Sequence, residues 1–357
     1  MFKPLSDWMQ EKNSAYYKSP NTIIYDDFAT YAQSEKGMLT AANARDFYFR
    51  TEKIEKKQYA ILEVGVGNGA FCAGFLEEIA RLDEKNGTSR LSKINYYLAD
   101  FSKPALERAQ KFNAKLSIFC EIKTILLDAS KMPPAHVKLS TKKEKNAKGA
   151  LSNADAPNSS KERANEIFET EKFDLIRCNE LFSDLPANLY LQNEGGIFHA
   201  LIDEKMRPRL EIAQNLGELE RRLLLSLPKN LLIPINSAAA DSILFFASRL
   251  QEGGCMDIFD YGFYKKEDFD IPLQMWNFSI VRDFGGQWAV DLNFLYLAPL
   301  LSSLGKSALV EPQKEYVQNI IKEKLSLSDE EGLDYSQNRD NFEEDDSFYH
   351  MRVSNLQ

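Results

Sequence analysis

Three glycines that alternate with other residues follow a short apolar run. The run is Tyr59–Val64, with Glu63 near its end, and the glycines are Gly65, Gly67 and Gly69. Apolar residues then recur at helical spacing from Phe71 to Leu82. This pattern predicts a strand, a tight loop and an amphipathic helix, the opening unit of a doubly wound α/β sheet. Glycines suit such a loop because they adopt positive φ without strain and let a ligand approach the backbone.

Two classes of ligand use this geometry, because the free N–H groups and positive dipole end of the helix face the loop. The stretch from Gly65 to Ala70 fits the dinucleotide pattern G-x-G-x-x-G/A. The pattern E-x-G-x-G-x-G is also the first motif of class I S-adenosylmethionine (SAM) methyltransferases. The carboxylate of Glu63 favours SAM, since it suits the methionyl ammonium group and would repel a pyrophosphate. A plain turn between strand and helix, without a ligand, is the third interpretation.

The next two predicted strands also end in acidic residues. The strand 94–100 ends in Asp100, placed to hold two ribose hydroxyls, and a helix capped by Ser102 follows. The stretch from Gly69 to Asp100 is about 30 residues long, whereas about 20 are usual for a dinucleotide site. The strand 122–127 is followed by Asp128, either a ligand of the adenine amine or an ordinary carboxylate at a strand end.

Polar residues also follow the predicted fourth strand, 173–178. They are Asn179, Glu180, Ser183 and Asp184, and Pro186 follows two residues after the last of them. The carboxyl end of a strand beside the topological switch point faces the ligand crevice of an open α/β sheet. We therefore interpret this segment as part of a binding site.

The composition limits the classes of function. The chain has 357 residues and a net charge of −9, which argues against a nucleic-acid or anionic-membrane binder. The four cysteines are far apart, each in an apolar context, so buried free thiols are expected. The three histidines are equally scattered, and no metal site is expected. The absence of a signal-like apolar segment and of a membrane-length apolar run favours a cytoplasmic protein.

We predict an α/β fold in five parts. Residues 1–58 form an N-terminal extension and 59–190 the first part of the SAM-binding core, with a lysine-rich, mobile insertion at 131–170. Residues 191–230 form a helical insertion between strands four and five, helical from about Pro208. The core resumes at 231–310, and the C-terminal segment 311–357 is partly disordered because 326–346 is acidic and poor in apolar residues.

Further elements are predicted within these parts. A helix covers 41–50, and another covers 238–250. The fifth strand is 255–260, preceded by a turn at Gly253-Gly254. Strands at 278–281 and 289–297 complete the sheet, and 348–353 is a last strand.

Taken together, these segments resemble the MidA-like methyltransferases, a family that includes the mitochondrial complex I assembly factor that methylates an arginine. The resemblance extends over nearly the whole chain. It rests on Tyr16-Tyr17, Asp27-Phe28-Ala29-Thr30, Glu63 to Gly69, Asp100-Phe101-Ser102 with Leu106 and Gln110, Asn179 to Pro186, Asp260-Tyr261-Gly262, and Asn293-Phe294 with Gly305. The chain departs from the family pattern at four positions, and at one of them Asp100 replaces a glutamate. Asp26 replaces a glycine, Ser183 stands where the family has aspartate, and Gln287 stands where a final D-I-T motif would begin.

The resemblance implies a class I SAM-methyltransferase sheet, SAM as cofactor and an arginine of a protein substrate as methyl acceptor. The implied cofactor-binding residues are Glu63, Gly65, Gly67, Gly69, Asp100, Phe101, Asp128 and Asn179. A guanidinium is protonated at physiological pH, so carboxylates must hold it and draw charge from the attacking nitrogen. The candidates are Glu180, Asp27 and Asp260, with Asp184 as a further one. Asp27 and Asp260 are alternatively loop caps that bind no substrate.

Two other functions are compatible with the sequence. One is a dinucleotide-dependent oxidoreductase that uses the same glycine loop. The other is a non-catalytic assembly factor that keeps the fold and the cofactor, an interpretation favoured by the departures at Ser183 and Gln287.

Overall fold

The computed structural model describes residues 1–18, 38–54, 56–133, 167–168, 170–325 and 347–356. Asp27 and most of the lysine-rich segment 131–170 lie outside the described residues, as does the segment 326–346.

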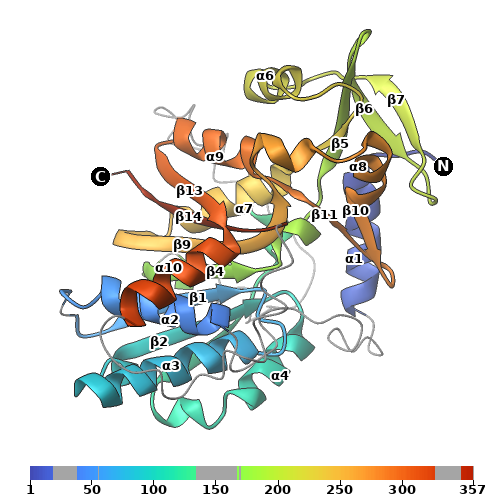
Figure 1. The fold of residues 1–357 in the computed structure, drawn as a ribbon. Coiled ribbons are helices and arrows are strands. Elements are labelled where there is room, and N and C mark those ends of the chain that lie inside the picture. The colour runs from blue at the N-terminus through green and yellow to red at the C-terminus, as the bar shows by residue number, and fades with distance from the viewer. Residues whose placement is uncertain (19–37, 55, 134–166, 169, 326–346, 357) are drawn as a thin grey trace, which may run out of the picture.

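The centre of the fold is an eight-stranded sheet in the order β13-β14-β9-β4-β1-β2-β3, with β12 also paired to β9 (Figure 1). Its strands are β1 (Tyr59–Val64), β2 (Ile94–Asp100), β3 (Glu121–Leu126), β4 (Phe173–Asn179), β9 (Leu250–Phe263), β12 (Leu292–Asn293), β13 (Lys306–Pro312) and β14 (Phe348–Asn355). Neighbours from β3 to β9 are parallel, and β14 is antiparallel to both β9 and β13. The chain moves outward from β1 to β3 and returns to β4 on the other side of β1. The switch point therefore lies between β1 and β4.

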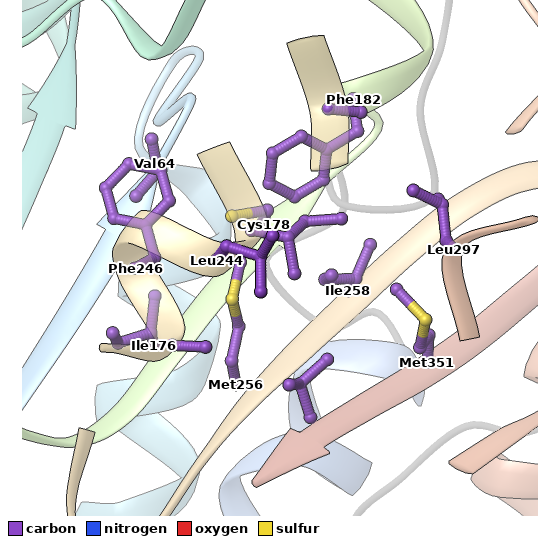
Figure 2. Packing of buried hydrophobic residues seen from close by; sticks show 14 of the residues in the cluster. Val64, Ile176, Cys178, Phe182, Leu244, Phe246, Met256, Ile258, Leu297 and Met351 are labelled. Atoms are coloured by element: carbon purple, nitrogen blue, oxygen red, sulfur yellow. The ribbon is translucent and has the colours of Figure 1, made fainter. Parts of the chain in front are cut away.

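Helices cover both faces of this sheet (Figure 1). One face carries α2 (Met38–Arg50), α3 (Ala70–Asn86), α4 (Lys103–Phe112) and α10 (Gln313–Leu325), and the other carries α7 (Ser237–Ala247) and α9 (Phe294–Ser303). Tyr59 and Ile61 of β1 pack towards α2 and α3, whereas Leu62 and Val64 pack towards α7 and α9. Figure 2 shows this second core, in which Val64 lies among residues of β4, β9 and α7. Because β1 is buried on both faces, it reads as a continuous apolar run.

A row of charged residues, buried except for the partly exposed Arg352, crosses four neighbouring strands on the face below α2. Glu63 on β1 lies opposite Arg177 on β4, Arg177 opposite Asp257 on β9, and Asp257 opposite Arg352 on β14. Arg177 contacts Glu63 at 2.7 Å, and Arg352 contacts Asp257 at 2.7 Å. Asn43 of α2 joins the two pairs, accepting from Arg177 at 3.3 Å and donating to Asp257 at 2.8 Å. The alternating charges compensate one another where water is excluded.

The segment between β4 and β9 forms a second, antiparallel sheet in the order β7-β6-β5-β8. Its strands are β5 (Asn188–Asn193), β6 (Gly196–Ile202), β7 (Pro208–Ile212) and β8 (Leu232–Ile235). The prediction of a helical insertion is wrong in this respect: only α6 (Glu218–Ser226) is helical there, and Pro208 begins a strand. The small sheet shares a core with α1 (Leu5–Lys18), α8 (Leu273–Ser279) and the hairpin of β10 (Val281–Phe284) and β11 (Gln287–Val290).

Other predicted elements are confirmed or corrected. The first, second and fourth strands and the helix after Ser102 are confirmed, as is a last strand near 348–353. The predicted strand at 278–281 is wrong, because α8 and the β10–β11 hairpin occupy this region. The predicted strand at 289–297 is confirmed in the main sheet only at Leu292–Asn293, since α9 begins at Phe294. The strands β13 and β14 complete the sheet at its edge. The predicted turn at Gly253-Gly254 lies inside β9, where the pairing to β4 shifts register. Short 3-10 turns are η1 (Leu91–Lys93), η2 (Leu116–Ile118), η3 (Ala129–Lys131), η5 (Phe182–Asp184) and η6 (Lys266–Phe269).

Candidate functional site

The loop between β1 and α3 depends on its glycines. Gly65, Gly67 and Gly69 have φ angles of 76°, 57° and 88°, in the left-handed region that glycine adopts without strain. The N–H of Gly65 donates to the carbonyl of Ala99 at 2.9 Å, which holds the loop beside the end of β2. A Cβ at Gly69 would lie 2.6 Å from Nδ2 of Asn113, so this glycine also allows α4 to pack closely.

Asp100 ends β2 next to this loop. Its Oδ1 accepts from the N–H of Ser102 at 2.8 Å, and the residue is 9% exposed. Burial raises the pKa of Asp100 to about 6, while backbone N–H groups of Ser102, Val66 and Gly67 act in the opposite direction. Phe101 follows, and its ring meets the ring of Tyr17 edge-on at 5.3 Å between centroids. A carboxylate and an apolar ring thus lie together beside the glycine loop.

Glu63 lies below the loop and is engaged within the protein. Its Oε2 accepts from Arg177 at 2.7 Å and from the hydroxyl of Tyr96. Burial raises the pKa of Glu63 to about 7, against the lowering effect of Arg177. Its predicted contact with the methionyl ammonium group of SAM stays a prediction. Arg177 was not among the predicted site residues, although a charged residue inside the apolar strand 173–178 indicates a buried partner of opposite charge.

The end of β4 comes next to the glycine loop. The side chain of Leu181 packs against Gly65, where it would lie 3.1 Å from an added Cβ. The preceding residues, Asn179 and Glu180, therefore lie at the same edge of the sheet as the glycine loop. Glu180 has a φ of 48°, a left-handed conformation that is uncommon for residues other than glycine and recurs at functional sites. Its N–H donates to the carbonyl of Phe259 at 2.7 Å, and Nδ2 of Asn179 donates to its Oε1 at 3.2 Å.

Asp260 is fully buried in the last part of β9 and caps the loop after β4. Its Oδ2 accepts from the N–H groups of Phe182 at 2.9 Å and Ser183 at 3.1 Å, and its Oδ1 from that of Tyr261. Burial raises the pKa of Asp260 to about 6. These hydrogen bonds show that Asp260 caps the loop, which was one of the two predicted roles. A catalytic role for Asp260 stays a prediction.

Asp184 faces the N-terminal helix. Its Oδ2 accepts from the hydroxyl of Tyr17 at 2.5 Å, and its backbone carbonyl accepts from Asn13 at 2.9 Å. Burial raises the pKa of Asp184 to about 7. The hydrogen bonds from Tyr17 and Gln287 lower this pKa, whereas the nearby Asp260 carboxylate raises it. Tyr17 was noticed in the sequence only as part of a tyrosine pair, and its contacts with Phe101 and Asp184 place it at this edge of the sheet.

Asp128 lies at the end of β3 as the N-cap of η3. It accepts from the N–H of Ser130 at 3.1 Å and pairs with Lys131 at 2.6 Å. Burial would raise the pKa of Asp128, but the hydrogen bonds from Lys131 and Ser130 outweigh it and the pKa lies below its ordinary value. Its predicted contact with adenine stays a prediction. Asp27 cannot be placed, since it lies outside the described residues.

Three further expectations concern the whole chain. Cys72, Cys120, Cys178 and Cys255 are buried free thiols, as predicted. Among the described residues, no group of three or more His, Cys, Asp or Glu side chains is arranged to hold a metal ion. Within the same described part of the chain, no helix is both long and apolar enough to cross a membrane.

A family model described as "Putative S-adenosyl-L-methionine-dependent methyltransferase" matches residues 44–277. The match covers more than half of the chain, and the chain belongs to this family. Comparison with curated proteins found no match. The family favours SAM over a nicotinamide dinucleotide as the ligand of the glycine loop. The finer resemblance to the MidA-like methyltransferases is compatible with it.

Solved structures agree on the fold. Two structures of COG1565 superfamily proteins from Burkholderia thailandensis each align with a TM-score of 0.63 at 16% identity, covering 99% of this chain and 88% and 87% of theirs. One of these is described as bound to S-adenosyl-homocysteine. The plantazolicin methyltransferase BpumL aligns at a TM-score of 0.44 and 10% identity over 99% of this chain and 97% of its own, too distant to carry an argument. The predicted class I methyltransferase sheet is thus confirmed.

The residues at the switch point fit the family's cofactor. The loop uses three glycines in the left-handed region, and there is little room for a side chain at Gly65, because Leu181 packs against it. The carboxylate of Asp100 is the type of group that holds ribose hydroxyls at the end of a second strand. The family implies SAM as the cofactor. The assignment of these residues as its binding site stays a prediction.

Proposed function

We propose that the protein transfers a methyl group from SAM to a nitrogen of an arginine side chain on a protein substrate. The observation that carries the acceptor side of this proposal is that three carboxylates lie just after β4 and in the last part of β9. They are Glu180, Asp184 and Asp260, and the segment that holds the first two packs against the glycine loop. Acidic side chains beside a methyl donor suit a cationic acceptor.

The role proposed for each carboxylate follows from its surroundings in the structure. When bound, SAM supplies an electrophilic methyl group. Glu180, next to the loop, would hold the guanidinium by charge-assisted hydrogen bonds and align one nitrogen with the methyl carbon. As the new N–C bond forms and the S–C bond breaks, the nitrogen must lose a proton. Asp184, whose pKa is about 7, is suited to accept it near neutral pH.

Tyr17 and Asp260 support these groups. The hydroxyl of Tyr17 fixes one oxygen of Asp184 at 2.5 Å. Asp260 holds the loop that carries Asp184 through the N–H groups of Phe182 and Ser183. We assign Asp260 a positioning role on this ground.

The test is transfer of radiolabelled methyl from SAM to proteins of a cell extract, followed by identification of the modified residue. Glu180→Gln should lose nearly all transfer while still binding S-adenosylhomocysteine. Glu194→Gln is the matched control, because the Glu194 side chain is 89% exposed on the turn between β5 and β6. Transfer to arginine that survives Glu180→Gln undiminished would remove the role assigned to Glu180, and labelling of another residue type would refute the arginine acceptor.

A second candidate is a SAM-binding assembly factor without turnover. The observation that favours it is the burial of Ser183, which is 0% exposed where the resemblance leads one to expect an aspartate. Tight binding of S-adenosylhomocysteine, with no methyl transfer to any protein, would support this alternative.

A further inference from the structure

The outer edge of the small sheet is open to a partner. β7 is the last strand on its side of the order β7-β6-β5-β8, so no strand of the described residues pairs with its outer edge (Figure 1). All five residues of β7 are exposed, and Leu210 and Ile212 are 39% and 74% exposed. A free strand edge with apolar side chains is a template for pairing with another strand.

The hydrogen-bond pattern shows which backbone groups face outward. Ala213 donates to Ile197 at 2.9 Å and Asp203 to Arg207 at 3.2 Å, and both pairs continue the β6–β7 register. Hydrogen-bonded pairs alternate along an antiparallel ladder. Arg209 and Glu211 therefore direct their backbone groups towards β6. Pro208, Leu210 and Ile212 direct theirs outward, where Leu210 and Ile212 each offer an N–H and a carbonyl.

The sequence of β7 is self-complementary about Leu210. In antiparallel pairing of two copies centred there, Leu210 meets Leu210, and Arg209 of each copy meets Glu211 of the other. These two side chains share one face of the strand, since they already contact each other within the chain at 2.7 Å and are each 53% exposed. Pro208 meets Ile212 on the opposite face, where its missing N–H removes only one bond per copy.

We propose that β7 is the interface of a symmetric dimer in which the small sheets of two copies join edge to edge. The partner is a second copy of this chain, because a two-fold axis at Leu210 places opposite charges together and apolar residues together. Four backbone hydrogen bonds form across the axis, two between the Leu210 residues and two from Ile212 to the carbonyl of Pro208. An isologous contact of this kind closes on itself and does not propagate into a fibre.

The experiment measures the mass of the purified full-length protein by sedimentation velocity over a wide concentration range. Wild type should show a reversible monomer–dimer equilibrium. Arg209→Glu and Glu211→Arg each place like charges opposite each other, and each should raise the dissociation constant about tenfold. The double variant exchanges the two charges and should restore the wild-type constant. Arg222→Glu is the matched control, since Arg222 is 76% exposed on α6, and it should leave dimerisation unchanged.

A backbone variant tests the same contact independently of charge. Leu210→Pro removes an outward N–H and spares the hydrogen bonds to β6, so the protein should stay folded by circular dichroism and become monomeric. The proposal is overturned if wild type is monomeric at every concentration, or if the folded single variants dimerise as wild type does. It is also overturned if these variants change only the affinity for a peptide acceptor, because the edge would then receive substrate.

Discussion

Glu63 and Arg177 lie directly opposite each other on β1 and β4, and their side chains form a buried ion pair of 2.7 Å immediately before the glycine loop. Arg177 is 1% exposed and also lies 4.0 Å from the ring centre of Phe71 in α3. The pair therefore joins the two strands that flank the switch point to the helix that follows the loop.

Removing one partner of this pair should be costly. We expect Arg177→Met to lower the free energy of unfolding by about 3–5 kcal/mol, because it leaves the Glu63 carboxylate buried without a counter-charge. The double variant Glu63→Gln with Arg177→Met should lose much less unfolding free energy, because no unpaired charge stays buried. Urea unfolding measures both, and equal losses in the single and double variants would contradict the pairing.

The stability loss of the Arg177→Met variant should depend on pH. The folded-state pKa of Glu63 is raised from 4.5 to about 7, so ionisation of this carboxyl favours the unfolded state as pH rises through that window. Without Arg177 the pKa should rise further. The stability lost in Arg177→Met should therefore be greatest above pH 7 and smallest below 4.5, where the carboxyl is protonated in both states. A loss that does not vary with pH would assign the effect to packing.

Gly69 and Gly87 form a matched pair for testing the loop. Both have positive φ, at 88° and 63°, so alanine should cost about 1–2 kcal/mol at either position from backbone conformation. A Cβ at Gly69 also meets Nδ2 of Asn113 at 2.6 Å and Cα of Ala109 at 2.8 Å, whereas nothing lies within 4 Å at Gly87. Thermal unfolding should show the greater loss for Gly69→Ala. Equal losses would contradict the close packing of α4 against the loop.

The pair of Tyr17 and Asp184 predicts the pH profile of methyl transfer. Because Asp184 accepts a proton only when ionised, the rate should rise with pH through its pKa of about 7. Tyr17→Phe keeps the ring but removes the hydrogen bond that lowers this pKa, so the rising limb should move to higher pH. A limb that stays in place, measured as kcat against pH, would remove Asp184 from this role.

Much of the main sheet was predictable because parallel strands buried on both faces read as apolar runs. The runs at Tyr59–Val64, Ile94–Asp100 and Phe173–Asn179 each correspond to a strand, and Ser102 caps the following helix as expected. The small sheet was not predictable in this way. The strand β7 alternates polar and apolar residues, but over only five positions. The spaced leucines from Leu210 to Leu223 form a longer pattern of helical type, and the region was therefore interpreted as one helix, of which only Glu218–Ser226 is helical.

The candidate site was predictable at the glycine loop and at the strand ends, because glycines and carboxylates at these places indicate ligand binding by their residue type alone. The partners of the acids were not, because they come from distant parts of the chain. Glu63 and Arg177 are far apart in sequence, as are Tyr17 and Asp184. Only the strand order and the path of α1 bring them together.

Asp100 should contribute directly to cofactor affinity. Asp100→Asn removes the charge that would strengthen hydrogen bonds from the ribose hydroxyls, and we expect roughly tenfold to hundredfold weaker binding of S-adenosylhomocysteine. Asp83→Asn is not a suitable control, because Asp83 accepts from Leu91 at 2.8 Å within the fold. Glu107→Asn is suitable, since its side chain is 66% exposed on α4. Equal affinity of Asp100→Asn and wild type would contradict this role.

The most direct test of the account is calorimetric titration of the wild-type protein with S-adenosylhomocysteine, with NAD in a parallel titration. We predict saturable binding of S-adenosylhomocysteine at one site per chain, a matching rise in thermal stability, and no binding of NAD. A folded protein that shows neither heat nor thermal shift with S-adenosylhomocysteine at millimolar concentration would contradict the assignment of the glycine loop as a SAM site.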